Sequence, residues 1–335
     1  MIRSALVFGT SLAIAACAAQ PQNPTPPVAA PGSESALPPV ADPPVPVEDS
    51  RPVGTLVMAH GGTPEWNAMV EGAVERLRAT RPTALAYGMA NPYTLRAALD
   101  SLDEQGVERV AVVRMFLSGR SFEQQTHYFL GLSDRAPEAF VLMGPAASDP
   151  DARAPLSHDL EVATHADGLL PSSEAATIVE SRALGLSRDP ASESVLLIAH
   201  GMGDERENDE VLSVMEGMAR RIETHGFASV RVETLREDWE GPRAEAEQRI
   251  RGFVADQSDE GRRVLVVPVR LAGFGPYAEV LTGLDYVAGE GLLPHDAIAS
   301  WVERTSERVV CSAGWASGPD TCAPATTSTV TPPLR

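Results

Sequence analysis

The chain has 335 residues, with 46 acidic residues against 27 basic ones and a formal net charge of −19, and every basic residue is an arginine. The absence of lysine excludes a phosphate-binding lysine loop, a Schiff base with pyridoxal phosphate and a Ser–Lys dyad. The negative charge argues against a nucleic-acid partner, because such binding depends on neutralising phosphates. The length allows two domains with full hydrophobic cores.

The first residues are typical of an export signal. Residues 1–16 carry Arg3 and then an apolar run that is too short to span a bilayer as a helix. The run ends in Ala15-Ala16-Cys17, which resembles a bacterial lipobox, so Cys17 is predicted to be lipidated. We therefore expect a lipoprotein of the cell envelope, anchored to the periplasmic face of the inner or the outer membrane.

The two ends of the chain have compositions that do not form a core. Residues 17–52 are rich in Pro and Ala and predict an extended tether, and residues 309–335 form a C-terminal tail that becomes Pro- and Thr-rich. Besides Cys17 the chain has only Cys311 and Cys322, and exported proteins meet an oxidising environment. We predict a Cys311–Cys322 disulfide; two free thiols or a metal pair are the alternatives.

A duplicated pattern lies between these ends. Residues 55–61 and 195–201 are each an apolar run of strand length that ends in Ala-His-Gly, with histidines at His60 and His200. Each run is followed by helix-period and strand-period segments in the same order. The expected helices are 65–79, 94–105, 206–224 and 241–256, and the expected strands are 84–89, 109–117, 230–235 and 263–271.

Apolar strands that alternate with helices specify an α/β fold with parallel sheets. We predict two tandem units, residues 53–187 and 188–308, each a parallel β-sheet flanked by helices. Ligands of such sheets bind beyond the carboxyl ends of the strands. Both Ala-His-Gly turns and two later small-residue turns, 118–121 and 272–275, should lie at those ends.

The histidines are the first candidates for chemistry. An imidazole at a strand end can ligate a metal or accept a proton near neutral pH, although one such residue alone is more often a structural cap of the strand. Ser121 is expected to start a helix on which Glu123 and His127, four residues apart, share one face. They form either a carboxylate–imidazole pair or part of a solvated surface.

Three of the other histidines lie between or after the repeated segments. His158 and His165 lie between the units and are expected to be exposed, whereas His295 is expected to shape the start of a final helix, 296–305. The sequence has no CxxC pair, HExxH, GxSxG, GxGxxG or Walker pattern. The chain therefore lacks the sequence signatures of zinc proteases, α/β-hydrolases and nucleotide-binding proteins. We expect neither a nucleotide nor pyridoxal phosphate as cofactor.

The whole pattern resembles the sirohydrochlorin chelatase (CbiX-like) family, which has the class II chelatase fold built from flavodoxin-like units. The resemblance covers roughly residues 54–305 and rests on the strand-His-Gly starts, on Tyr87-Gly-Met-Ala90 and on Leu235-Arg-Glu-Asp238. It implies a lyase that inserts a divalent metal such as Co²⁺, Fe²⁺ or Ni²⁺ into a tetrapyrrole. It also implies that His60, with His200 as its repeat counterpart, contacts the metal.

The resemblance implies a second histidine near Arg120-Ser121 or near Phe274-Gly275, and both places lack it. One interpretation is that His127, backed by Glu123, joins His60 in catalysis and in metal binding. The carboxylates of the tetrapyrrole would then be held by arginines at strand ends: Arg114, Arg120, Arg236 and Arg270. The other interpretation is a non-catalytic envelope lipoprotein that binds a metal, a ligand or a protein partner.

Overall fold

The computed structural model describes residues 51–316 and Cys322. The predicted signal peptide, Cys17, nearly all of the tether and most of the tail lie outside the described residues. All the described residues belong to one compact unit. Among these described residues, no helix is both long enough and apolar enough to cross a membrane.

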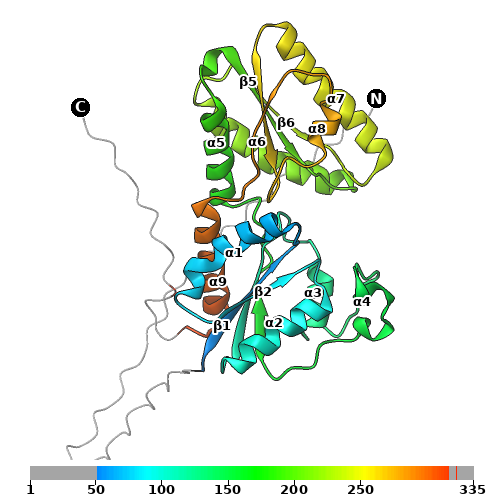
Figure 1. Ribbon diagram of the computed structural model, residues 1–335, viewed down its shortest axis with the longest axis vertical. Helices are drawn as coiled ribbons and strands as arrows, with labels where there is room; N and C mark the ends of the chain where they lie inside the picture. Colours follow the sequence, from blue (N-terminus) through cyan, green and yellow to red (C-terminus); the bar gives the residue numbers. More distant parts are fainter. Residues whose placement is uncertain (1–50, 317–321, 323–335) are drawn as a thin grey trace, which may run out of the picture. The chain divides into compact units, whose positions relative to one another are not determined.

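Two parallel sheets of four strands each form the framework, which confirms the predicted fold class (Figure 1). The first sheet has the order β2-β1-β3-β4, with β1 (Val53–Ala59), β2 (Thr83–Tyr87), β3 (Arg109–Arg114) and β4 (Glu161–Thr164). The second has the corresponding order β6-β5-β7-β8, with β5 (Glu193–Ala199), β6 (Ser229–Thr234), β7 (Arg263–Val269) and β8 (Val287–Ala288). The duplicated sequence therefore encodes a duplicated sheet.

Four long helices follow the predicted periodicity closely: α1 (Pro64–Arg78), α2 (Pro92–Glu104), α6 (Glu205–Glu223) and α7 (Glu240–Asp259). Thr63, Asn91 and Asp204 cap α1, α2 and α6 by accepting hydrogen bonds from backbone N–H groups of the first turn. The remaining helices are α3 (Glu123–Phe129), α4 (Pro145–Ser148), α5 (Ser173–Leu186), α8 (Tyr277–Val280), α9 (Asp296–Ser312) and the 3₁₀ turns η1 (Pro150–Arg153) and η2 (Pro190–Ser192).

The two units exchange their last helices. Helix α5 follows the first sheet in the sequence but packs against β7 and α6, whereas α9 follows the second sheet and packs against α1, β1 and β3 (Figure 1). The predicted boundary between the units, at residues 187 and 188, lies between the strands of the first sheet and those of the second. Each unit nevertheless depends on a helix contributed by the other.

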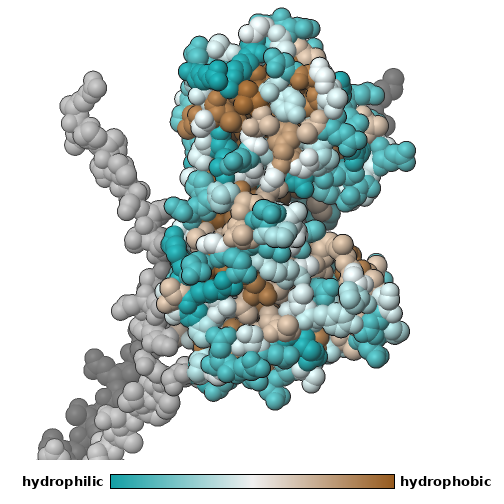
Figure 2. Space-filling view, viewed as in Figure 1, coloured by the Kyte–Doolittle hydropathy of each residue, from teal (hydrophilic) through white to brown (hydrophobic). Residues whose placement is uncertain are grey.

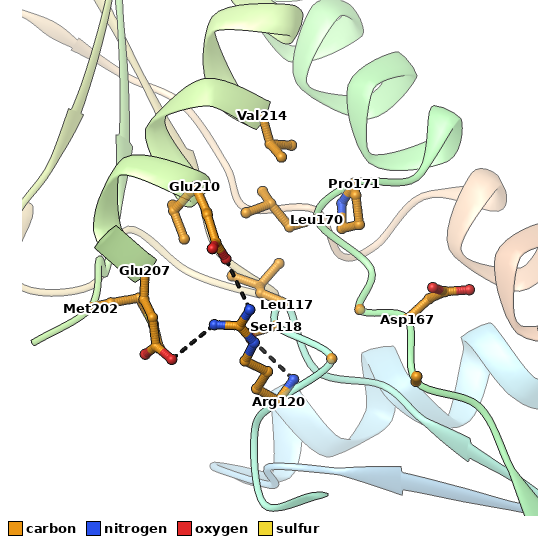
Figure 3. Close-up of a pocket in the computed structure, with 14 residues that line it drawn as sticks. Leu117, Ser118, Arg120, Asp167, Leu170, Pro171, Met202, Glu207, Glu210 and Val214 are labelled. Carbon is orange, nitrogen blue, oxygen red and sulfur yellow. Dashed lines mark hydrogen bonds and ion pairs between the residues drawn. The ribbon is translucent and has the colours of Figure 1, made fainter. Parts of the chain in front are cut away.

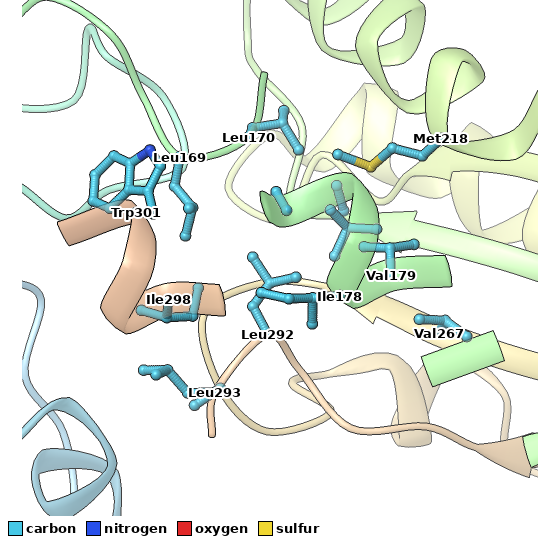
Figure 4. Packing of buried hydrophobic residues seen from close by; sticks show 14 of the residues in the cluster. Leu169, Leu170, Ile178, Val179, Met218, Val267, Leu292, Leu293, Ile298 and Trp301 are labelled. Carbon is cyan, nitrogen blue, oxygen red and sulfur yellow. The ribbon is translucent and has the colours of Figure 1, made fainter. Parts of the chain in front are cut away.

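One shared core extends through both units. One face of each sheet contributes to it, through residues such as Val57 and Val267, together with α1, α5, α6 and α9. Figure 4 shows Trp301 and Ile298 of α9 and Ile178 of α5 in this core. The other face of the first sheet is covered by α2 and that of the second by α7. Burial on both faces explains why these strands are continuous apolar runs. Hydrophilic side chains cover much of the face drawn in Figure 2, in keeping with the acidic composition.

Two local predictions were wrong. His165 is buried, 9% exposed, and its Nε2 accepts the backbone N–H of Arg114 at 3.0 Å, because the residues before it form β4 beside β3. Ser121 does not cap α3: Phe122 precedes that helix in a left-handed conformation, with φ of 54° and no side-chain cap.

Two other local predictions are confirmed. His295 precedes α9, and its Nδ1 accepts the backbone N–H of Ala297 at 3.1 Å. Cys311 and Cys322 form the predicted disulfide, with their Cα atoms 5.5 Å apart. The disulfide ties the end of α9 to a residue of the C-terminal tail.

Candidate functional site

The two Ala-His-Gly turns have the same local geometry. His60 follows β1 and His200 follows β5, and the next residues, Gly61 and Gly201, have φ of 79° and 84°. In each turn the imidazole Nδ1 lies 2.9 Å from the carbonyl oxygen of the following glycine. A carbonyl oxygen can only accept, so Nδ1 carries the proton and, in the neutral ring, Nε2 keeps its lone pair.

Both turns open into one cleft of about 470 Å³. His60 and His200 therefore contribute to the same site, one from each unit. Most of the other side chains that line it are apolar or aromatic: Trp66, Met89, Phe116, Leu117, Phe122, Leu170, Met202, Val211, Trp239 and Leu271. The polar side chains at its wall, besides the two histidines, are Ser118, Ser121, Asp238 and Arg270.

A tryptophan lies against each turn. Trp66 of α1 packs so closely on Gly62 that a Cβ there would lie 3.1 Å from the indole. Trp239 lies in the same way over Gly203, and its ring meets His200 edge to face, with the centroids 5.8 Å apart. The cleft thus has an imidazole and an indole on each side.

The two histidines differ in what they meet at Nε2. His200 Nε2 lies 3.2 Å from a carboxylate oxygen of Asp238, which follows β6. For His60 the described part of the chain places no partner on Nε2. The duplication has therefore produced one histidine beside a carboxylate and one that faces the cleft alone.

Glu123 and His127 are placed together on α3 but do not line the cleft. Glu123 binds the guanidinium of Arg114 at 3.3 Å. Burial, and then the charge of Arg114, lowers the pKa of His127 from its ordinary value, so this ring is neutral at pH 7. Over residues 51–316 and Cys322, no group of three or more His, Cys, Asp or Glu side chains is arranged to hold a metal ion.

The four arginines have different surroundings. Arg114 is 1% exposed and also donates to the carbonyl of His165 at 2.8 Å. Arg236 is buried as well, and it donates to the carbonyls of Met202 and Gly203 at 2.7 and 2.5 Å. These two guanidinium groups hold backbone segments in place.

Arg270 and Arg120 are nearer to solvent. Arg270 lines the cleft, lies over the ring of Tyr277 and is 3.4 Å from the carboxylate of Glu237. Arg120 borders an adjoining cavity and is bound by two glutamates of α6. Of the four, Arg270 is therefore the one whose side chain meets the cleft that contains the histidines.

Three residues of the cleft were missed by the sequence reasoning as candidates for function: Trp66, Asp238 and Trp239. Asp238 ends the segment Leu235-Arg-Glu-Asp238 that carried part of the resemblance, and Trp239 follows it directly. Their place in the sequence could have indicated them, because residues just beyond β6 lie at the same sheet edge as His200, which lies just beyond β5.

Comparisons with known proteins establish the fold. No protein-family model matches the sequence, and no curated protein does. Among solved structures, SirB from Bacillus subtilis with Fe³⁺ is 14% identical over 78% of this chain and 98% of that chain, with a TM-score of 0.56. The sirohydrochlorin chelatase SirB from Bacillus subtilis subspecies spizizenii in complex with cobalt is 12% identical over 78% of this chain and 97% of that chain, with a TM-score of 0.52. The chain therefore has a chelatase-like fold.

Proposed function

We propose that this chelatase-like protein binds a divalent metal ion and a tetrapyrrole in the cleft between its two units. The observation that carries the proposal is that both Ala-His-Gly histidines open into one cleft with aromatic and apolar walls. A tetrapyrrole is a flat conjugated ring with carboxylate arms, which suits indole rings, imidazoles and one arginine. The cleft volume, about 470 Å³, lies in the range of small-molecule sites, about 300–1,000 Å³.

His200 and Asp238 are spaced to hold the metal substrate. Two donor atoms that are each about 2.1 Å from one metal lie about 3.2 Å apart when the angle at the metal is about 100°. His200 Nε2 and Asp238 Oδ2 are 3.2 Å apart. The hydrogen bond from Nδ1 to the Gly201 carbonyl is the kind of contact that orients metal-binding histidines. Iron and cobalt, which the two SirB structures contain, are the metals to test first.

Insertion of the metal releases two protons from the pyrrole nitrogens as the metal–nitrogen bonds form. His60 Nε2, with its lone pair, is placed to accept one of them. As the metal moves to the ring, His200 and Asp238 lose it and become free to accept the other. Arg270 is the candidate partner for a carboxylate arm.

Titration of the purified full chain with sirohydrochlorin and Co²⁺, separately and together, tests this proposal. We expect binding of each and, in combination, the absorption change of a metallated ring. His200→Ala and Asp238→Asn should each weaken Co²⁺ binding by about tenfold or more. His225→Ala is the matched control, because His225 pairs with Glu180 on the surface of α5. Metal binding that is unaffected by His200→Ala would contradict the assignment.

A second candidate is binding without insertion. It is favoured by the two positions where the family resemblance calls for another histidine: Arg120 is bound by glutamates, and Phe274 stacks on Tyr286 with the ring centroids 5.8 Å apart. An arginine remains cationic and neither ligates a metal nor accepts a proton. Binding of both ligands with no metallated product over hours would select this candidate.

We also propose that the protein works in the cell envelope, held by a lipid on Cys17. The support is the sequence before Cys17, an apolar run that ends in two alanines. A Cys17→Ser variant should move from the membrane fraction to the soluble envelope fraction. A wild-type protein that carries no lipid by intact-mass measurement would refute this proposal.

A further inference from the structure

Arg120 connects the two units beside the cleft. It belongs to the turn after β3, and its guanidinium reaches α6 of the other unit (Figure 3). The guanidinium lies 2.8 Å from the carboxylate of Glu207 and 3.1 Å from that of Glu210. We call these three residues the Arg120 latch.

On the first unit, the backbone that carries Arg120 is fixed. A Cβ added at Gly119 would lie 1.9 Å from the carbonyl oxygen of Ala166, and one at Gly168 would lie 2.1 Å from that of Leu117. The turn therefore packs backbone against backbone, which leaves it little room to move. Leu117 and Ser118, just before it, line the cleft.

On the second unit, the glutamates belong to the same piece of structure as the His200 turn. Asp204 follows that turn and caps α6 by accepting the N–H of Glu207 at 3.0 Å. Arg236 ties the carbonyls of Met202 and Gly203 to the side chain of Glu205. The first turn of α6 is therefore linked to the backbone of Met202 and Gly203, which directly follows the His200 turn.

The latch also stands beside a second cavity, of about 250 Å³, which Arg120, Glu207 and Glu210 line. This cavity has walls in common with the cleft: Leu117, Ser118, Leu170, Met202 and Val211. The ion pairs thus hold together the two segments, 117–118 and 200–202, between which the cleft lies.

We propose that Arg120 is a positioning residue: it latches α6 to the first unit and sets how far the cleft opens, so that ligands enter and leave when the latch opens. Because Arg120 is 51% exposed, salt weakens its ion pairs, and cleft opening should rise with ionic strength. The consequence for ligand release rests on the proposed function, whereas the opening itself does not.

Acrylamide quenching of tryptophan fluorescence measures the opening without any ligand. Trp66 and Trp239 line the cleft, whereas Trp301 and Trp315 are buried elsewhere. In the full chain we expect quenching of the cleft tryptophans to rise between about 0.05 and 1 M NaCl, because the screening length falls to about 3 Å at 1 M, close to the 2.8 and 3.1 Å of the latch's ion pairs. Trp66→Phe and Trp239→Phe variants identify the residues that respond.

Arg120→Gln should show, at every salt concentration, the quenching that the wild type reaches only at about 1 M NaCl. Glu207→Gln is the second variant, chosen because Glu210 also pairs with Arg206. Arg220→Gln is the matched control, since Arg220 pairs with Glu216 on the same helix at 3.9 Å and lines neither of these two cavities. Arg120→Glu combined with Glu207→Arg should restore the response to salt. Quenching that is the same in the wild type, Arg120→Gln and Glu207→Gln would overturn the proposal.

Release of sirohydrochlorin then separates the latch from the proposed function. Arg120→Gln should release it faster by about threefold to tenfold, as expected for loss of two half-exposed ion pairs. If sirohydrochlorin does not bind but quenching responds as described, the latch stands and the proposed function fails. If it binds and neither release nor quenching changes in the variants, the proposed function stands and the latch fails.

Discussion

Replacement of Arg114 by methionine distinguishes a structural arginine from a ligand-binding one. The family resemblance implies that Arg114 clamps a carboxylate of the ligand, but its side chain is buried at the carboxyl end of β3. It donates to the His165 carbonyl at 2.8 Å, to the Glu123 carboxylate at 3.3 Å and to the Ser121 carbonyl at 3.4 Å. Only the first contact has the length of a strong hydrogen bond.

The expected loss of stability follows from these contacts. One good hydrogen bond from a charged donor contributes about 1.5–3 kcal/mol, while removal of a buried charge returns part of its desolvation cost. We therefore expect Arg114→Met to destabilise the fold by about 2 kcal/mol, which lowers Tm by about 4–8 °C for a protein of this size. Thermal unfolding measures the change, and sirohydrochlorin titration below Tm measures any loss of binding.

The control for this prediction is Arg270→Gln. Arg270 lines the cleft and is partly exposed, so we expect stability to change by less than about 0.5 kcal/mol and tetrapyrrole affinity to fall by about tenfold. The opposite pattern would refute the assignment. In that case Arg114→Met would lose binding with an unchanged Tm, and Arg270→Gln would unfold early and bind normally.

Three further predictions test the surroundings of the site. Burial lowers the pKa of His165 to about 4, with help from the charges of Arg114 and Arg308 and against that of Asp167. Between about pH 6.5 and 4 the unfolded chain therefore binds a proton that the folded chain does not. The stability that is present above pH 6.5 is lost as the pH falls towards 4, and the free energy of unfolding should fall by about 2.5 kcal/mol between pH 7 and 4.5. His165→Gln keeps an acceptor for the Arg114 N–H, and its free energy of unfolding in urea should lack this part of the pH dependence. If the free energy of unfolding changed equally with pH in the wild type and the variant, the role of His165 would be disproved. Gly119→Ala should destabilise by about 3 kcal/mol or more because its Cβ would meet a carbonyl oxygen at 1.9 Å, whereas Gly72→Ala in α1, with nothing within 4 Å, should stabilise by about 0.5–1 kcal/mol in the same assay. Trp301→Ala, in the core that α9 completes, should cost about 3–5 kcal/mol in thermal or urea unfolding, and a smaller loss would show that α9 matters little to that core.

The sheets were predictable because their sequence signal is strong. The central strands β1, β3, β5 and β7 are buried on both faces, so each is a nearly unbroken apolar run. The starts of helices α1 and α2 are indicated by a cap residue followed by proline at the first helical position. Such features depend on neighbouring residues, which a single sequence displays directly.

The exchange of α5 and α9 could not be predicted in the same way. An amphipathic pattern indicates that one face of a helix is buried, but it does not specify which sheet that face packs against. The burial of His165 was missed for a related reason. It follows β4, a strand of four residues, Glu161–Thr164, that is only partly buried and too short to show a period. Its environment is created by β3 and α9, which are far away in the sequence.

The candidate site depends on a difference between two copies of one motif. The sequence presents His60 and His200 as equivalent, since both follow an apolar strand and precede glycine. The difference arises one strand away: beyond β6 Asp238 approaches the ring of His200, whereas beyond β2 the cleft is lined by Met89. A metal held at His200 and a proton acceptor at His60 would be two unlike tasks on opposite units. Two such halves act together only if the distance between the units is controlled. The Arg120 latch, at the position where the family resemblance calls for a histidine, is placed to provide that control.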